Sequence, residues 1–422
     1  MYITILRSIF MIKQRIITKK LIFLFCLFII STLSLGMNKL EDNLDGKIFK
    51  NIYIENIDVG KMNIHEASKQ ISNTYKLKPI NIKYISKKWT INPKDIKLDY
   101  NIDKSLQNAY SYTRSDNSKE NLKRIFNLTF KEKYKIELIA TYDEIALSKL
   151  IENISKEINR EVKQASIQVT ESSQILKTPS KEGVEVDIVK LKEEIYNMLD
   201  KKYIKEIELP TRIIKPTITT EDVESVNTIL GQYSTSFNNN TPRGSNIHVA
   251  GQSTSDILIM PGEIFSYNTS TGARTWSNGY KTAKVIVGGK YVNGEGGGVC
   301  QVSTTIYNAA LLAGMEIEEV HNHTFASRYA PRGKDAAVSY GYTDLKFKNP
   351  FSHPIYIKNI VSNGAITSKI YGCKQDREKL YIRTEEKYNK DKINVKTYRI
   401  YLDEENNKIR EELIAESKYK IK

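Results

Sequence analysis

The sequence predicts an α+β protein that consists of an N-terminal membrane anchor, a two-part α+β region, an α+β C-terminal domain and a small β appendage. Three observations lead to this prediction. A basic segment runs into an apolar stretch at the N-terminus. Between residues 45 and 215, strand-like alternation and helix-like spacing of apolar residues follow one another repeatedly. Further along, a glycine-rich turn leads directly into a helix-like segment.

The N-terminus has the composition of a membrane-targeting segment. Residues 1–20 are basic and residues 21–37 are largely apolar. Basic flanks stay on the cytoplasmic side of a membrane, so we expect a single-pass protein of the cell membrane with the bulk of the chain extracellular. The apolar run is slightly short for a spanning helix and slightly long for a signal peptide, and Ser34 to Gly36 also fits a cleavage site. We favour an uncleaved anchor, with cleavage as the alternative.

Residues 45–215 predict a two-part α+β region. Its first part has strand-like segments at 52–54, 57–60, 80–85 and 89–91 and a helix-like stretch at 64–75. Its second part, from residue 134, has helix-like stretches at 142–158 and 188–199 and strand-like segments at 165–169, 184–187 and 205–209. We expect the linker to the next domain at 216–222, where Thr219 or Thr220 can cap a helix.

Composition narrows the class of partner. The chain has 422 residues and a net charge of +15, but its lysines are scattered, as on a solvated surface. No zinc-finger spacing, Walker loop or RNP-like aromatic motif is present, so we expect no nucleic-acid partner. A basic protein outside a cell is instead attracted to anionic wall polymers and to lipid head groups. The sequence also has no nucleotide-binding pattern, and we expect no cofactor.

Cys300 is a candidate nucleophile. It follows the glycine-rich run 294–298 and precedes a helix-like segment. Backbone N–H groups at the start of a helix stabilise a thiolate and lower its pKa. The adjacent Gly297 and Gly298 allow a substrate carbonyl to come close, and the backbone from Gly298 to Gln301 could supply an oxyanion hole. The alternative is a small buried side chain, a common role of a free cysteine.

Two of the five histidines lie downstream of Cys300. His321 and His323 alternate as on one face of a strand, so at least one could be an ordinary packed or surface histidine. A cysteine, a histidine and a carboxylate are the parts of an acyl-transfer site, and Asp335 is the candidate carboxylate. We favour His323 as the base because of its role and motif. A zinc site on Cys300, His321 and His323 is disfavoured because zinc-ligand-pair spacing occurs only once, and no metal is expected.

Three motifs occur in order in the C-terminal half: Pro261 to Asn268 reads PGEIFSYN, Gly296 to Gln301 reads GGGVCQ, and Gly333 to Ala336 reads GKDA. Together they resemble the VanW domain, over residues 230–372. This family takes its name from an association with vancomycin-resistance clusters. Some members are regarded as L,D-transpeptidases that form 3-3 cross-links in peptidoglycan, with the motif cysteine as nucleophile.

The resemblance assigns roles to particular residues. It implies that Cys300 is the nucleophile and that His323 is the family histidine. The sequence departs from the family pattern at Glu319-Val320, where a Glu-Arg pair is expected. This departure leaves the role of His321 open.

The regions that flank this domain carry weaker signals. The order of elements in residues 45–215, with the turn from Gly183 to Asp187 and the patterned helix after it, resembles the peptidoglycan-binding module often found ahead of L,D-transpeptidase or VanW domains. The alternative is a spacer that lifts the catalytic domain from the membrane, since a fold alone does not give a function. Residues 373–422 alternate apolar and polar side chains and predict a small antiparallel β appendage.

The first functional hypothesis is a membrane-anchored, cysteine-dependent L,D-transpeptidase that forms 3-3 peptidoglycan cross-links through a thioester intermediate. Its partners would be peptidoglycan stem peptides. Arg274, Arg328 and Arg332 are candidates to bind stem carboxylates, and a surface ion pair is the alternative for each. A second hypothesis is a non-catalytic peptidoglycan-binding or glycopeptide-resistance accessory protein. A third is a cysteine peptidase or amidase of stem peptides, in which water replaces the amine acceptor.

Overall fold

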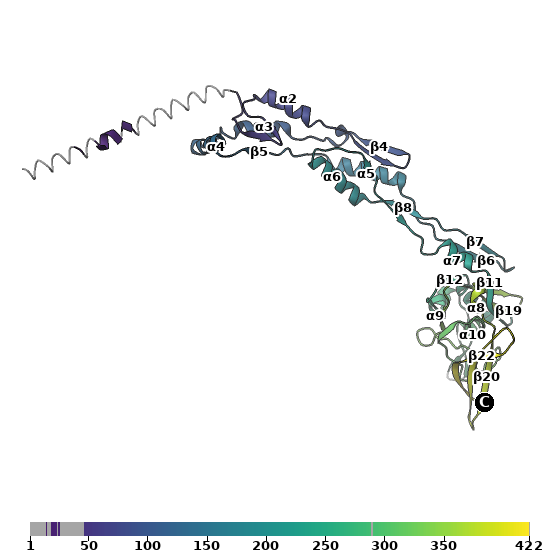
Figure 1. The fold of residues 1–422 in the computed structure, drawn as a ribbon. Coiled ribbons are helices and arrows are strands. Elements are labelled where there is room, and N and C mark those ends of the chain that lie inside the picture. The colour runs from purple at the N-terminus through teal and green to yellow at the C-terminus, as the bar shows by residue number, and fades with distance from the viewer. Residues whose placement is uncertain (1–13, 15–17, 23, 26–45, 288–289, 422) are drawn as a thin grey trace, which may run out of the picture. The chain divides into compact units, whose positions relative to one another are not determined.

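The computed structural model describes residues 14, 18–22, 24, 25, 46–287 and 290–421. The predicted basic segment (1–20) and membrane anchor (21–37) lie mostly outside these residues. Within the described part of the chain, no helix is long and apolar enough to cross a membrane. The chain forms two compact units, residues 1–160 with 184–212 and residues 161–183 with 213–422. Both units mix helices with small sheets, so the predicted α+β class is confirmed (Figure 1).

The first unit contains two three-stranded sheets, in the orders β2-β1-β5 and β4-β3-β9, and a β8–β10 pair. Its strands are β1 (Ile52–Ile54), β2 (Ile57–Asp58), β3 (Ile80–Tyr84), β4 (Lys87–Ile91), β5 (Tyr134–Ile136), β8 (Gly183–Val186), β9 (Ile207–Glu208) and β10 (Thr211–Ile214). Its helical segments are α2 (Ile64–Thr74), η1 (Pro93–Ile96), α3 (Ile102–Ser111), α4 (Ser118–Phe130), α5 (Glu144–Ile158) and α6 (Ile188–Asp200).

Capping residues set the helix starts of this unit. Asp143 and Asp187 accept hydrogen bonds from the first turns of α5 and α6, which leaves fewer backbone N–H groups unpaired. The predicted helices at 142–158 and 188–199 are therefore confirmed. Helices α3 and α4 were not predicted. Helix α4 buries only Leu128, and the apolar Leu122 and Phe126 of its sequence stay exposed.

The second unit is built around a four-stranded antiparallel sheet in the order β11-β19-β18-β12. Its strands are β6 (Ser166–Val169), β7 (Ile175–Thr178), β11 (Thr228–Ser236), β12 (Ile257–Ile259), β13 (Ile264–Ser266), β14 (Thr282–Val287), β15 (Lys290–Glu295), β16 (Glu316–Glu319), β17 (Lys346–Lys348), β18 (Ile355–Ser362), β19 (Ala365–Gly372), β20 (Leu380–Tyr388), β21 (Lys392–Leu402) and β22 (Lys408–Lys420). Its helical segments are α7 (Thr220–Ser225), α8 (Pro242–Ser253), α9 (Tyr267–Thr271), η2 (Trp276–Asn278), α10 (Val299–Leu312) and η3 (Lys374–Asp376).

Helix α10 is the central helix of this unit. It packs against β11, β19 and α8 (Figure 1). Almost every residue from Val299 to Leu311 is buried, so no face of the helix is exposed to solvent. Its hydroxyl and amide side chains must consequently find partners inside the protein, and these partners position the candidate site.

The predicted β appendage forms the antiparallel sheet β20-β21-β22. It belongs to the second unit. The fully buried Arg399 of β21 donates to the carbonyl of Met315, just after α10, at 2.7 Å. This sheet is therefore part of the support of α10.

Candidate active site

The start of α10 is shaped by close packing of glycines. Gly298 caps the helix with φ +116°, a conformation that side chains rarely adopt. A Cβ on Gly297 would lie 2.5 Å from the carbonyl oxygen of Lys284 on β14. The buried Asn246 donates to the carbonyls of Gly297 and Lys281, at 3.0 and 2.9 Å. The glycine turn is thus fixed against α8 and β14, with Cys300 in the first turn of the helix.

Cys300, His323 and Asp335 lie together, as the sequence predicted. His323 Nδ1 hydrogen-bonds Asp335 Oδ2 at 2.6 Å, and the same oxygen accepts from the His323 backbone N–H at 2.8 Å. The side chains of His323 and Asp335 are only 12% and 1% exposed. The Cys300 thiol donates to the Val338 carbonyl at 3.5 Å, and it lies near enough to His323 for each side chain to shift the pKa of the other. This is the arrangement of a nucleophile, a base and a group that orients the base.

Charge in the cluster favours a thiolate–imidazolium pair. Burial opposes ionisation of Cys300, but the hydrogen bond and charge of His323 outweigh it, so the pKa of Cys300 lies below its ordinary value. Burial also lowers the pKa of His323, yet the hydrogen bonds and charges of Asp335 and Cys300 raise it to about 10. Both shifts favour a thiolate at Cys300 beside a protonated His323.

Polar side chains of α10 fix the turn that carries Asp335. Ser303 donates to the Ala336 carbonyl at 2.7 Å, and Thr304 accepts from the Ala336 N–H at 3.0 Å. One turn later, Asn308 donates to the Lys334 carbonyl at 2.7 Å. Because these residues share a helix with Cys300, the helix sets both the nucleophile and the carboxylate.

The C-terminal sheet closes the cluster from another direction. Tyr419 of β22 donates its hydroxyl proton to Asp335 Oδ1, and the same hydroxyl accepts from the Gly333 N–H at 2.7 Å. Thr397 of β21 donates to the Gly333 carbonyl at 2.8 Å. Next to His323, Asn322 donates to the Lys418 carbonyl at 2.9 Å. Both segments that carry the histidine and the carboxylate thus rest on the β20-β21-β22 sheet.

Arg274 is the cationic side chain next to this cluster. Its Nη2 donates to Asn268 at 2.6 Å, and its guanidinium lies over the rings of Tyr267 and Tyr340, at 5.5 and 5.6 Å. Its Nε and Nη1 atoms are buried and have no hydrogen-bond partner in the described part of the chain. Its charge also helps to lower the pKa of Cys300. Unpaired buried donors of this kind can bind a carbonyl or carboxylate of a ligand.

The other predicted binding residues have different surroundings. The buried Gln301 side chain donates to Thr235 and to the Ser236 carbonyl, at 3.0 and 2.9 Å, and so anchors α10 on β11. Arg332 pairs with Glu386 at 2.9 Å. Arg328 is exposed and makes no hydrogen bond or ion pair to another described residue.

His321 lies outside the Cys300 cluster. Its Nε2 contacts Glu319 at 3.0 Å, and its side chain is 46% exposed. Glu319 also pairs with Lys346 at 2.9 Å. Of the two histidines, only His323 contacts Asp335 and Cys300 in the described structure.

Sequence reasoning missed two tyrosines of the cluster. Tyr329 has its hydroxyl 3.4 Å from His323 Nε2, and Tyr419 bonds Asp335. The chain has 26 tyrosines, and neither of these lies in one of the three motifs. A surface hollow of about 310 Å³ was also not foreseen. It is lined by the start of α8 and by Thr282 to Lys284, the segments against which Gly297 and Gly298 pack.

Comparison with known proteins finds two families that match parts of the chain. The family described as "VanW like protein" matches residues 242–371, and the family described as "Putative peptidoglycan binding domain" matches residues 89–208. The chain therefore carries a VanW-like domain and, ahead of it, a domain of the peptidoglycan-binding family. The resemblance predicted from the three motifs is confirmed.

Two curated proteins are similar to part of the chain. The uncharacterized protein YoaR of Bacillus subtilis (strain 168) is 39% identical over 167 residues, which is 39% of this chain and 55% of that protein. The vancomycin B-type resistance protein VanW of Enterococcus faecalis (strain ATCC 700802 / V583) is 27% identical over 135 residues, 31% of this chain and 49% of that protein. The chain spans about half the length of these relatives. No solved structure matches it.

Proposed function

We propose that this chain is a membrane-anchored cell-wall enzyme, a cysteine-dependent L,D-transpeptidase that forms 3-3 cross-links in peptidoglycan. The observation that carries the proposal is the Cys300 thiol beside His323, whose Nδ1 is held at 2.6 Å by the buried Asp335. The VanW-like and peptidoglycan-binding matches give the chain a role connected with the cell wall. The transfer reaction, and the membrane anchor at residues 21–37 with the bulk of the chain extracellular, are our proposals.

In the first step, the Cys300 thiolate attacks the carbonyl carbon of the third stem residue. A C–S bond forms, the amide C–N bond to the terminal D-alanine breaks, and the His323 imidazolium gives its proton to the departing amine. The Cys300 N–H is in the first turn of α10, where a backbone N–H has no intrahelical acceptor. This N–H is the donor we assign to the developing oxyanion.

In the second step, a side-chain amine of a neighbouring stem attacks the thioester carbonyl. A new amide C–N bond forms, His323 takes the proton of the amine, and Cys300 leaves as the thiolate. The raised pKa of His323, about 10, suits it to carry a proton before the first step and to take one up again in the second. If water replaces the amine, the same residues release a free tripeptide stem, which is the peptidase alternative.

Arg274 is the residue we assign to binding the donor stem. Its buried Nε and Nη1 atoms lack partners in the described structure, and its charge acts on Cys300. A carbonyl or carboxylate of the stem would satisfy both donors, so substrate binding would remove the cost of leaving them unpaired. Arg332 is less suited because Glu386 already pairs with it.

The direct test is incubation of the full-length chain with a disaccharide tetrapeptide, with the products separated by mass. We expect a dimer whose mass equals two donors minus one D-alanine. Cys300→Ala should abolish the product, while His321→Ala, which changes a histidine outside the cluster, should retain it. Formation of the tripeptide stem without any dimer would favour the peptidase alternative. Absence of both products, with binding to peptidoglycan retained, would favour the non-catalytic accessory protein and contradict the proposal.

A further inference from the structure

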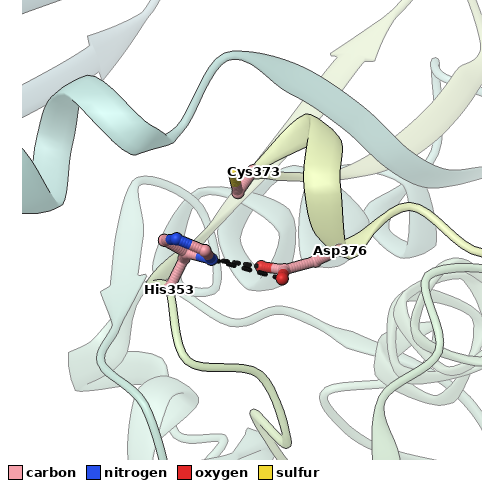
Figure 2. A group of neighbouring side chains, drawn as sticks. All are labelled: His353, Cys373 and Asp376. Atoms are coloured by element: carbon pink, nitrogen blue, oxygen red, sulfur yellow. Dashed lines mark hydrogen bonds and ion pairs between the residues drawn. The ribbon is translucent and has the colours of Figure 1, made fainter.

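A second group of metal-ligating side chains lies apart from Cys300. It consists of His353, Cys373 and Asp376, and the potential ligand atoms of the three residues lie within 4.8 Å of one another (Figure 2). His353 Nδ1 contacts both carboxylate oxygens of Asp376, at 3.2 and 3.0 Å. Cys373 is a free thiol and is only 6% exposed. It is the one such group in the part of the chain that the structure describes.

The fold holds these three residues in place through backbone bonds. Cys373 directly follows β19 and caps the short helix η3, and the Asp376 N–H donates to the Cys373 carbonyl at 3.0 Å. His353 precedes β18, and its carbonyl accepts from the fully buried Asn349 at 2.9 Å. Cys373 and Asp376 thus form a Cys-x-x-Asp turn, with the close spacing that zinc-ligand pairs use. The histidine reaches this turn from the neighbouring strand.

The chemistry of the donors selects the ion. Thiolate, imidazole and carboxylate together suit Zn²⁺, whereas Ca²⁺ and Mg²⁺ prefer oxygen ligands alone. Three protein ligands leave a fourth position for water, and the His353 side chain, 31% exposed, gives access to solvent. A simple His–Asp ion pair explains neither the free buried thiol beside it nor the turn that presents it.

We propose that His353, Cys373 and Asp376 bind one Zn²⁺ ion, with water as the fourth ligand. In a tetrahedral site with zinc-to-ligand bonds of about 2.0–2.3 Å, the ligand atoms lie about 3.3–3.8 Å apart. The most distant atoms of the group must therefore approach by about 1 Å while the His353–Asp376 contact opens slightly, and rotation of the side chains can supply both. On binding, the Cys373 thiol loses its proton to solvent and its sulfur forms a bond to the metal, while His353 and Asp376 exchange their direct contact for bonds to the ion.

The position of the site suggests what the ion does. His353 lies just before β18 and Cys373 just after β19, at the open end of the antiparallel pair in which Tyr356 is opposite Tyr371. After η3 the chain enters β20 and the sheet that supports Asp335. A bound Zn²⁺ therefore links the two strands at the open end of this hairpin and fixes the start of the C-terminal sheet. We assign it no part in the reaction at Cys300.

The test uses the full-length chain, first freed of metal by a chelator. Zn²⁺ is titrated in competition with a chromogenic chelator, and Co²⁺ is added separately as a spectroscopic probe. We expect one Zn²⁺ per chain and, with Co²⁺, a thiolate-to-cobalt charge-transfer band. Cys373→Ala should abolish the band, and His353→Gln and the nearly isosteric Asp376→Asn should each weaken Zn²⁺ binding at least about a hundredfold. Circular dichroism establishes that each variant is folded.

Two control variants identify the ligands. Cys300→Ala should retain the cobalt band, because the proposed thiolate is Cys373, and His321→Ala should retain full Zn²⁺ affinity. A band that survives in Cys373→Ala, or that disappears only in Cys300→Ala, would overturn the assignment. The same conclusion follows if folded Asp376→Asn and His353→Gln bind Zn²⁺ as the unaltered chain does, since the group would then be an ion pair beside a buried thiol.

Discussion

Replacement of Asp335 by Asn should separate the orientation of His323 from the presence of its ring. The carboxylate holds His323 Nδ1 at 2.6 Å and is almost completely buried. Asn keeps the size of the side chain, so the contact with the Tyr419 hydroxyl can persist with the roles of donor and acceptor changed. The charge that stabilises the imidazolium is lost. We therefore expect the pKa of His323 to fall and the pKa of Cys300 to rise.

The size of the effect follows from the raised pKa of His323. Its pKa moves from 6.5 to about 10, although burial acts in the opposite direction. Each pKa unit corresponds to about 1.4 kcal/mol, so the partners of the imidazolium contribute on the order of 5 kcal/mol. If Asp335 supplies about a third to a half of this, Asp335→Asn costs the ion pair about 2 kcal/mol. Below its pKa, Cys300 would then carry about ten- to a hundredfold less thiolate.

The assay is the rate of Cys300 alkylation as a function of pH, read at the Cys300 peptide by mass spectrometry so that Cys373 does not contribute. In the unaltered chain, we expect faster labelling at neutral pH than for an ordinary thiol, because the pKa of Cys300 lies below its ordinary value. In Asp335→Asn, the profile should move to higher pH. His321→Ala is the matched control and should leave it in place, since His321 contacts Glu319. A profile that does not move in folded Asp335→Asn would refute the assignment of Asp335.

His323→Ala should lower cross-link formation by about a hundredfold or more, while His321→Ala should have little effect, both measured on disaccharide tetrapeptide. Arg274→Gln should lower kcat/KM by about ten- to a hundredfold through the loss of charged hydrogen bonds, whereas the exposed Arg328→Gln should not; equal losses would show that charge alone matters. Tyr419→Phe should lower the free energy of unfolding in urea by about 1.5–3 kcal/mol, against almost nothing for Tyr381→Phe on the exposed side of β20. The hydrogen bond from Lys346 is the main reason that the pKa of Glu319 falls from 4.5 to about 2, so its stabilising effect is complete above pH 4.5 and disappears as the pH falls through 2. Glu319→Gln should therefore be less stable than the unaltered chain at pH 7 and equally stable near pH 2, and a deficit of equal size at both would contradict this linkage.

The parts of the site that could be predicted from the sequence are local. Cys300 was found because glycines precede it and a helix follows, and the structure has the helix start at Val299. His323 and Asp335 were found through short motifs. The contact between Tyr419 and Asp335 joins residues 84 positions apart, and no local pattern records it. Gln301 shows that sequence neighbours can have different roles. It directly follows Cys300 in the sequence, but its side chain turns toward β11 and not toward the cluster.

The C-terminal sheet illustrates the same limit at the level of a whole element. Alternation of apolar and polar residues predicted its strands, and β20, β21 and β22 confirm them. An alternating pattern indicates that one face of a strand is buried, but it does not indicate which part of the protein covers that face. In this chain, part of the cover is the turn from Gly333 to Asp335, which bonds Thr397 and Tyr419.

The C-terminal sheet is more than an appendage, because it contacts the candidate site. The VanW-like match ends at residue 371, whereas Tyr419 and Thr397 lie beyond it and bond the turn that carries Asp335. Tyr419 donates a hydrogen bond to the oxygen of Asp335 that His323 does not use. In this protein, the sheet after the VanW-like domain is therefore part of the structure that holds Asp335, and through it His323, in place beside Cys300.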